Sequence, residues 1–277
     1  MFCPFKLEEV EFNEKDFQTY CDKGQQILIE QANNVDESIQ KYLNPDGSLS
    51  ATDIESDWFP QIDADVFISH SHKDCLKVVA LIGYLSTLGL KIFADFLVWD
   101  YYVYLLKRVD DNYCLKRTNQ NGKHVYDYNI RNKSTAYVQT ILNSALMKMI
   151  DKTECLIFLE TPNSIKIREL NSVTTESCWI YSELLMSNCL RRKEPKRAQK
   201  HNVSNRLNFI TDKKPLIVEY RIDTSHMVPI TIKDIEKASN NGKNIGLDLL
   251  DQLYINKELV RGINLYGVTY YNKSRKN

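Results

Sequence analysis

An indole and a carboxylate stand one helical turn apart in the second half of the chain. Trp179 and Glu183 are four residues apart in the segment that begins at Ser177, so on a helix they share a face. A carboxylate beside a sugar stabilises the positive charge that builds on the ring when a glycosidic bond breaks. An indole stacks on flat rings or closes a pocket. An exposed glutamate beside a core tryptophan explains the same spacing.

Polar residues also follow two runs that predict neighbouring strands. These apolar runs, 65–69 and 90–94, flank a helical pattern over about 74–88. Such a β-α-β unit implies a parallel sheet, and ligands of such sheets lie beyond the carboxyl ends of the strands. Six residues near these ends, or at the start of the Glu183 helix, are therefore candidates for substrate binding: Phe93, Ser69, His70, Ser71, Asp95 and Ser177.

The rest of the chain continues the alternation of strands and helices. Apolar spacing predicts helices over about 134–150 and 177–190 and strands over 154–159 and 215–220. This pattern is typical of a doubly wound α/β sheet. One connection, about 96–133, is much longer than the others and is rich in aromatic and charged residues. We expect a functional or disordered insertion there, with a short helix near its start.

The first 60 residues differ from the remainder in charge. They hold 13 acidic and 4 basic residues, which leaves 23 acidic and 32 basic residues in the rest of the chain. Apolar residues recur at helical spacing from Phe17 to Leu43 and predict one long helix. We expect this acidic leader to pack on the main domain, or on a neighbouring copy of the chain.

Four segments together resemble the Toll/interleukin-1 receptor (TIR) family. Residues 67–74 resemble its first strand and loop, residues 90–95 its second strand, and residues 161–164 the stretch after its fourth strand. The segment that contains Trp179 and Glu183 resembles its Ser-x-Trp-Cys-x-x-Glu-Leu motif. The order and spacing of all four agree. The similarity is nearest to bacterial TIR proteins of Thoeris-type antiphage defence.

The resemblance implies a fold and a division of the chain. TIR domains have a flavodoxin-like α/β fold with about five parallel strands. We expect that domain over residues 62–222, with the insertion at about 96–133. Residues 1–61 are expected to form an acidic helical extension and linker, and residues 223–277 a C-terminal extension.

The resemblance also implies an activity. Many TIR enzymes break the nicotinamide–ribose bond of NAD+ and form ADP-ribose, a cyclic isomer of it or a conjugate, which acts as a signal. The family's catalytic glutamate falls on Glu183, and the aromatic residue that lines its site falls on Trp179. NAD+ is then a consumed substrate and no cofactor is needed. The expected partners are further copies of the chain and a separate effector protein that reads the signal.

Two other functions remain open. Many TIR domains act by assembly without catalysis, and the long insertion is suited to such contacts. A nucleoside deoxyribosyltransferase-like enzyme would also place a glutamate near a ribose.

Several classes of function are not favoured by the 277-residue sequence. There is no Gly-x-Gly-x-x-Gly fingerprint for redox use of NAD, and the spacing His70-x-His72-x-x-Cys75 lacks the second ligand pair of a zinc site. A formal net charge of zero argues against a protein that mainly binds nucleic acid. No apolar stretch is long enough to cross a membrane. Seven scattered cysteines, an odd number, predict reduced thiols and a cytoplasmic location.

Overall fold

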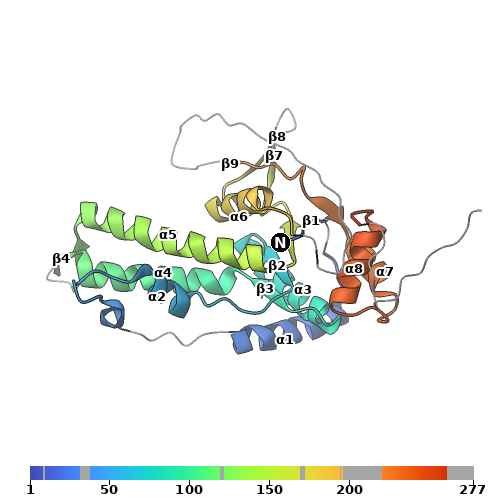
Figure 1. The fold of residues 1–277 in the computed structure, drawn as a ribbon, viewed down its shortest axis with the longest axis horizontal. Coiled ribbons are helices and arrows are strands. Elements are labelled where there is room, and N and C mark those ends of the chain that lie inside the picture. Colours follow the sequence, from blue (N-terminus) through green and yellow to red (C-terminus); the bar gives the residue numbers. More distant parts are fainter. Residues whose placement is uncertain are drawn as a thin grey trace, which may run out of the picture.

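The centre of the molecule is a parallel sheet of five strands (Figure 1). The computed structural model describes residues 1–8, 10–31, 38–118, 122–168, 172–193, 195 and 220–260. The sheet has the order β10-β1-β6-β2-β3, and all four neighbouring pairs are parallel. Its strands are β1 (Cys3–Glu8), β2 (Val66–Ser69), β3 (Ile92–Ala94), β6 (Cys155–Glu160) and β10 (Val228–Ile230). The expected α/β, flavodoxin-like architecture is confirmed.

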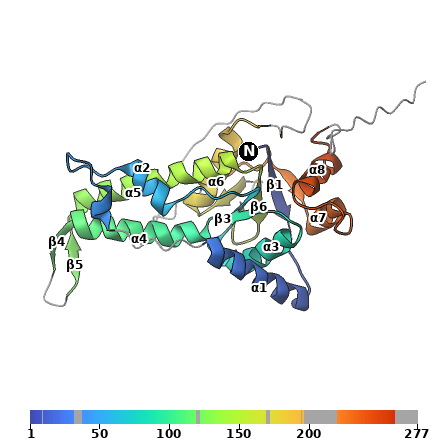
Figure 2. The same cartoon turned by 60° about the horizontal axis from the view of Figure 1, so that its bottom comes forward.

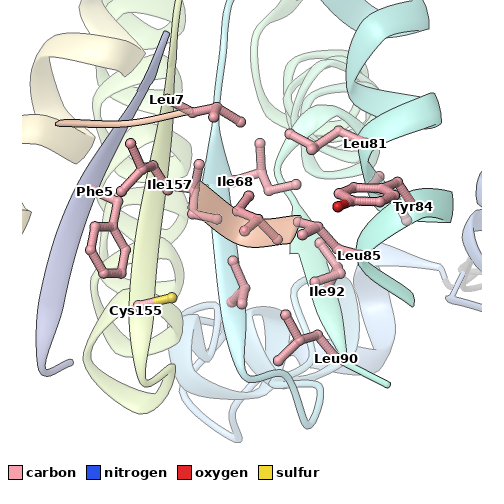
Figure 3. Packing of buried hydrophobic residues seen from close by; sticks show 14 of the residues in the cluster. Phe5, Leu7, Ile68, Leu81, Tyr84, Leu85, Leu90, Ile92, Cys155 and Ile157 are labelled. Carbon is pink, nitrogen blue, oxygen red and sulfur yellow. The ribbon is translucent and has the colours of Figure 1, made fainter. Parts of the chain in front are cut away.

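Helices cover both faces of the sheet. One face packs against α1 (Glu14–Gln31), α3 (Cys75–Thr87), α7 (Ile232–Ser239) and α8 (Leu247–Asn256). Figure 3 shows part of this core, with Ile68, Ile92 and Ile157 of three strands beside Leu81 and Leu85 of α3. The other face packs against α2 (Ala51–Trp58), α4 (Phe96–Tyr113), α5 (Tyr128–Lys152) and α6 (Cys178–Cys189). Because both faces are covered, β2 is apolar until its final serine and buried throughout.

The N-terminal segment contributes a strand to the sheet, which the sequence analysis did not anticipate. All six residues of β1 pair in register with β6, from Cys3 opposite Cys155 to Glu8 opposite Glu160. On its other side β1 pairs with β10, which lies in the segment expected to be a C-terminal extension. The expected boundaries at 61 and 222 therefore do not separate the sheet from flanking extensions. Both strands are short and carry charged or proline residues, so their composition gave no clear strand signal.

The leader helix is shorter than predicted. Instead of one helix from Phe17 to Leu43, the structure has α1 and then η1 (Ile39–Tyr42), and residues 32–37 lie outside the described ranges. α1 packs closely on α3 of its own chain (Figure 1). A Cβ atom added to Gly24 would lie 2.0 Å from the carbonyl oxygen of Val79, so the approach of the two helices depends on this glycine.

The long insertion is a helical arm, and the helix expected near its start is present but longer than predicted. It consists of α4, a hairpin of β4 (Leu115–Thr118) and β5 (His124–Tyr126), and the first turns of α5. Figures 1 and 2 show this arm extending well beyond the sheet, with the hairpin at its outer end. The predicted helix over 134–150 begins earlier, because the Asp127 side chain accepts hydrogen bonds from the amides of Asn129 and Ile130 and so caps α5.

A second, small sheet lies beside α6. It contains the antiparallel strands β7 (Lys166–Arg168), β8 (Ser172–Thr175) and β9 (Tyr220–Arg221). The predicted strand over 215–220 lies outside the described residues except for Tyr220, which pairs with β8 and not with the central sheet. Within the described ranges, no helix has both the length and the apolar character needed to span a membrane.

Candidate functional site

Glu183 lies inside the protein at the carboxyl end of β2. Ser177 starts α6, since its side chain accepts a hydrogen bond of 3.3 Å from the amide of Ile180. Glu183 lies on the helix face turned toward the sheet and is 0% exposed. Its Oε2 atom accepts a hydrogen bond of 2.6 Å from Oγ of Ser69, the last residue of β2. Glu183 is therefore not the exposed helix residue that the same spacing also allowed.

Two more of the candidate residues lie in the same buried region. His70 follows Ser69 directly, and Asp95 follows the last residue of β3. The Nδ1 atom of His70 lies 3.1 Å from Oδ1 of Asp95, and their side chains are 1% and 4% exposed. The Asp95 carboxyl group also lies close enough to Glu183 to raise its pKa. We call Ser69, His70, Asp95 and Glu183 the strand-end cluster.

The environment of this cluster shifts the pKa values of two of its members. Burial raises the pKa of Glu183 well above its ordinary value, and the Asp95 carboxyl raises it further, against the opposing hydrogen bond from Ser69. Burial alone would lower the pKa of His70, but the charge and hydrogen bond of Asp95 outweigh this and raise it to about 10. At neutral pH the geometry therefore favours a His70–Asp95 ion pair beside a protonated, neutral Glu183.

Trp179 lies one turn before Glu183 and is half-buried against the arm. Its ring meets Tyr102 of α4 edge to face, with centroids 5.5 Å apart and an interplanar angle of 71°. Both residues lie on α6 four positions apart, as the helical spacing predicts. The aromatic partner of Trp179 was not predicted, because the insertion was expected to be functional or disordered, with only a short helix near its start. The contact joins α6 to α4 beside the strand-end cluster.

Phe93 does not belong to the cluster. It precedes Asp95 by two residues on β3 and packs on Phe67, with ring centroids 5.3 Å apart. It also lines a separate, largely apolar pocket that contains none of the four cluster residues. This pocket is lined by Gln31, Trp58, Phe59, Pro60, Gln61, Ile62, Phe93, Tyr101, Ala145, Leu146 and Met149.

Ser71 and Ser177 hold the starts of helices. The Ser71 side chain accepts a hydrogen bond from the amide of Lys73, at the start of the short helix η2 (His72–Asp74). Ser177 does the same for α6. Both were candidates for substrate binding, and the structure uses both hydroxyls as caps. Serine before a helix is a common capping signal, which the sequence analysis did not weigh.

A neighbouring set of polar contacts went unrecognised in the sequence analysis. Asp74, buried at the start of α3, accepts hydrogen bonds from Oγ1 of Thr161 at 2.5 Å and from Nδ2 of Asn163 at 2.8 Å. These bonds fix the loop after β6 against the loop after β2. The available signal was the Thr-Pro-Asn sequence at 161–163, which resembles a family motif but was given no role.

A second charged group lies at the same edge of the sheet. Lys6 of β1 contacts Glu8 at 3.1 Å and Glu160 of β6 at 3.0 Å. Lys6 was not a candidate, since residues 1–61 were expected to form a helical extension and linker. Glu160 is bound to a cation and Glu183 to a hydroxyl, so the two carboxyl groups differ in environment.

Neither a metal centre nor a known relative helps to define the site. Among the described residues, no group of three or more His, Cys, Asp or Glu side chains is placed to hold a metal ion. Comparison with protein-family models, with curated proteins and with solved structures finds no match. The strand-end cluster and the sequence motifs are therefore the features from which a function can be inferred.

Proposed function

We propose that this chain cleaves the nicotinamide–ribose bond of NAD+, with Glu183 as the catalytic residue. The observation that carries the proposal is the hydrogen bond between Ser69 and Glu183 at the carboxyl edge of a parallel sheet. Ligands of this fold class lie at that edge. The bond orients the carboxyl group, and three further polar or aromatic side chains of the site flank it: His70, Asp95 and Trp179.

The chemistry requires one oriented carboxylate and little else. Cleavage moves the bonding electron pair onto the nicotinamide nitrogen, so the positively charged ring leaves as a neutral molecule without a general acid. Positive charge then builds on the ribose, and an ionised Glu183 stabilises it. The substrate's own positive charge favours ionisation of Glu183 on binding, because a nearby cation lowers the pKa of a carboxyl group.

The cluster has to open before a dinucleotide can reach Glu183. Glu183 has no exposed surface, and Trp179 packs on Tyr102 beside it. Asp95 is the residue that connects β3 to α4, so a displacement of α4 would separate Asp95 from both Glu183 and His70. The described conformation is therefore a resting state in this proposal, with a neutral glutamate and a closed site.

The product is proposed to be a signal. In bacterial TIR proteins that the four motifs resemble, an ADP-ribose derivative, cyclic or conjugated, is read by a separate effector during antiphage defence. We extend that role to this chain, with NAD+ as a consumed substrate and with assembly of several copies.

The carboxyl pair favours a second candidate function. Asp95 and Glu183 are neighbouring carboxyl groups of different protonation state, and such a pair suits an enzyme that must protonate a neutral leaving base. In a nucleoside deoxyribosyltransferase-like reaction the proton held by Glu183 would pass to the leaving base, and the Glu183 carboxylate that remains would act on the sugar.

The experiment compares substrates and two matched variants. Purified protein is incubated with NAD+ and, separately, with deoxynucleosides, and the released nicotinamide or free base is measured by liquid chromatography. Glu183→Gln is expected to lose nicotinamide release. Glu160→Gln, which changes another carboxylate at the same sheet edge, is expected to retain it.

The other possible outcomes support a different function or contradict the role of Glu183. Release of free base from deoxynucleosides, without cleavage of NAD+, supports the transferase. Equal nicotinamide release by wild type and Glu183→Gln contradicts the proposed role of Glu183. An assembled, folded protein that acts on neither substrate supports the interaction module.

A further inference from the structure

The arm carries a concentration of exposed apolar side chains. Fourteen large hydrophobic residues are exposed in the described part of the chain, and half of them lie on the arm. Tyr128 is 76% exposed and Tyr137 is 67% exposed. The seven residues are Val103, Tyr104, Tyr113, Leu115, Tyr128, Ile130 and Tyr137. Such a concentration on a projecting element is typical of an interaction surface.

The outer end of the arm is also basic. Residues 107–133 include seven Lys or Arg residues and three Asp residues. All three aspartates are engaged inside the arm: Asp110 accepts from Arg131 and Ser134, Asp111 from the Tyr126 hydroxyl, and Asp127 from backbone amides of α5. With seven basic and three acidic residues, this end of the arm carries a net positive charge, and most of its basic side chains are exposed. They include Lys107, Lys116, Arg117, Lys123 and Lys133.

An acidic surface lies on α1 and on Glu11, three residues before the helix begins. Five acidic side chains are exposed between residues 11 and 30, against two exposed lysines. Ile29 is exposed as well, and it shares a helix face with Asp22, seven residues earlier. The five acids are Glu11, Glu14, Asp16, Asp22 and Glu30.

The two surfaces of one molecule cannot meet each other. α1 lies against α3 at the sheet, while the hairpin lies at the far end of the arm in both views (Figures 1 and 2). α4 is a single helix of 18 residues, roughly 27 Å long, so the arm is a stiff projection. The acidic surface has to come from another molecule.

We propose that the outer end of the arm docks on α1 of a second copy of this chain. Tyr and Ile side chains supply the apolar centre of the contact and the basic residues its rim, facing the acids of α1. The contact joins two different surfaces. In a pair of copies, the copy that contributes its arm still has an unoccupied α1, and the other copy still has an unoccupied arm. Repetition then builds a ring or an open filament. The exposed Leu115 and Ile130 favour a protein partner over nucleic acid.

The test is a charge swap read by light scattering coupled to gel filtration. The arm variant Lys116→Glu/Arg117→Glu/Lys133→Glu and the α1 variant Glu11→Lys/Asp22→Lys/Glu30→Lys change exposed residues only. Each is expected to weaken self-association by roughly tenfold or more, since several rim pairs become repulsive. The variant with all six changes restores the pairing of opposite charges and is expected to recover association. Tyr128→Ser should weaken association without any change of charge.

Added salt provides an internal check. Association of the wild type is expected to weaken as salt rises, because the exposed charges become screened. A wild type that stays monomeric at high protein concentration and low salt overturns the proposal, as does a six-change variant that fails to recover. If the arm variant loses binding to a short DNA duplex while self-association is unchanged, the partner is nucleic acid and the proposal fails. None of these readouts depends on NAD+ cleavage.

Discussion

The Nδ1 atom of His70 lies 3.1 Å from Oδ1 of Asp95, and this ion pair borders the carboxyl group of Glu183. It comes from two neighbouring strand ends, whereas Glu183 arrives from a helix much later in the chain. Burial raises the pKa of Glu183, and the negative charge of Asp95 raises it further, so this glutamate stays protonated. The resting site is thus stable with Glu183 protonated, whereas the proposed cleavage requires Glu183 to be ionised.

Replacement of Asp95 by Asn should destabilise the protein. It leaves a charged, buried His70 without its partner, and breaking a buried pair in this way typically costs about 3 kcal/mol of unfolding free energy or more. Urea unfolding at pH 7 measures the change. Asp63→Asn is the matched control, because Asp63 pairs with Lys91 on the surface and such pairs contribute about 1 kcal/mol at most. Equal effects of the two substitutions would refute this view of the cluster.

Replacement of Glu183 by Gln should preserve the fold. The Gln amide oxygen can accept the Ser69 hydrogen bond, and the side chain is neutral like the protonated glutamate. A buried glutamate with a raised pKa stabilises the folded state while protonated, and this contribution is lost as pH rises above the ordinary value of 4.5. Unfolding experiments at acidic and mildly alkaline pH should therefore find Glu183→Gln increasingly stable relative to wild type as pH rises. A constant difference would mean that Glu183 is ionised in the folded state.

His70, a basic group, should make the stability of the protein depend on pH in a second range. Its pKa is raised from 6.5 to about 10, so its contribution is fully present below pH 6.5 and is lost as pH rises toward 10. The stability difference between wild type and His70→Gln should shrink over that range. Unfolding curves at several pH values measure it. A difference that is flat between pH 6.5 and 10 would show that His70 is neutral in the fold.

The close approach of α1 and α3 should not tolerate a side chain at Gly24. In Gly24→Ala the new methyl group would lie 2.0 Å from the Val79 carbonyl oxygen, so the helices must separate. We expect a loss of about 1–3 kcal/mol, the usual cost of overpacking. Thermal unfolding measures it, with the exposed neighbouring substitution Gln25→Ala expected to stay within about 0.5 kcal/mol. Similar melting temperatures for the two variants would indicate that α1 is not packed on α3 in this way.

Much of the sheet and the approximate position of the site could be predicted from the sequence. β2, β3 and β6 are apolar runs buried on both faces, and such runs are visible without a structure. The four amino acids of the strand-end cluster were all candidates, because the carboxyl ends of parallel strands meet at one edge. Their mutual contacts were not predictable, since His70 and Asp95 follow different strands and pair only once the sheet forms.

Three features could not be predicted, because they depend on packing in the folded protein: β1, the arm and the position of the Phe93 side chain. β1 takes its place through pairing with β6, about 150 residues later, and its alternation of Phe5, Lys6 and Leu7 is too short to stand out. The arm was also missed, because tyrosines and charges spread over α4 do not form a clear helical stripe when much of the helix projects beyond the sheet. Phe93 was assigned to the site by its position at a strand end, but its side chain packs with Phe67 instead.

The most direct test of the central claim is the rate of nicotinamide release from NAD+ by the assembled protein, compared with that of Glu183→Gln. Loss of an interaction that stabilises transition-state charge typically lowers the rate by about 10²–10³. We predict at least this decrease for Glu183→Gln, with Glu160→Gln close to wild type and all three proteins equally folded. Release that continues at the wild-type rate in Glu183→Gln would contradict the account.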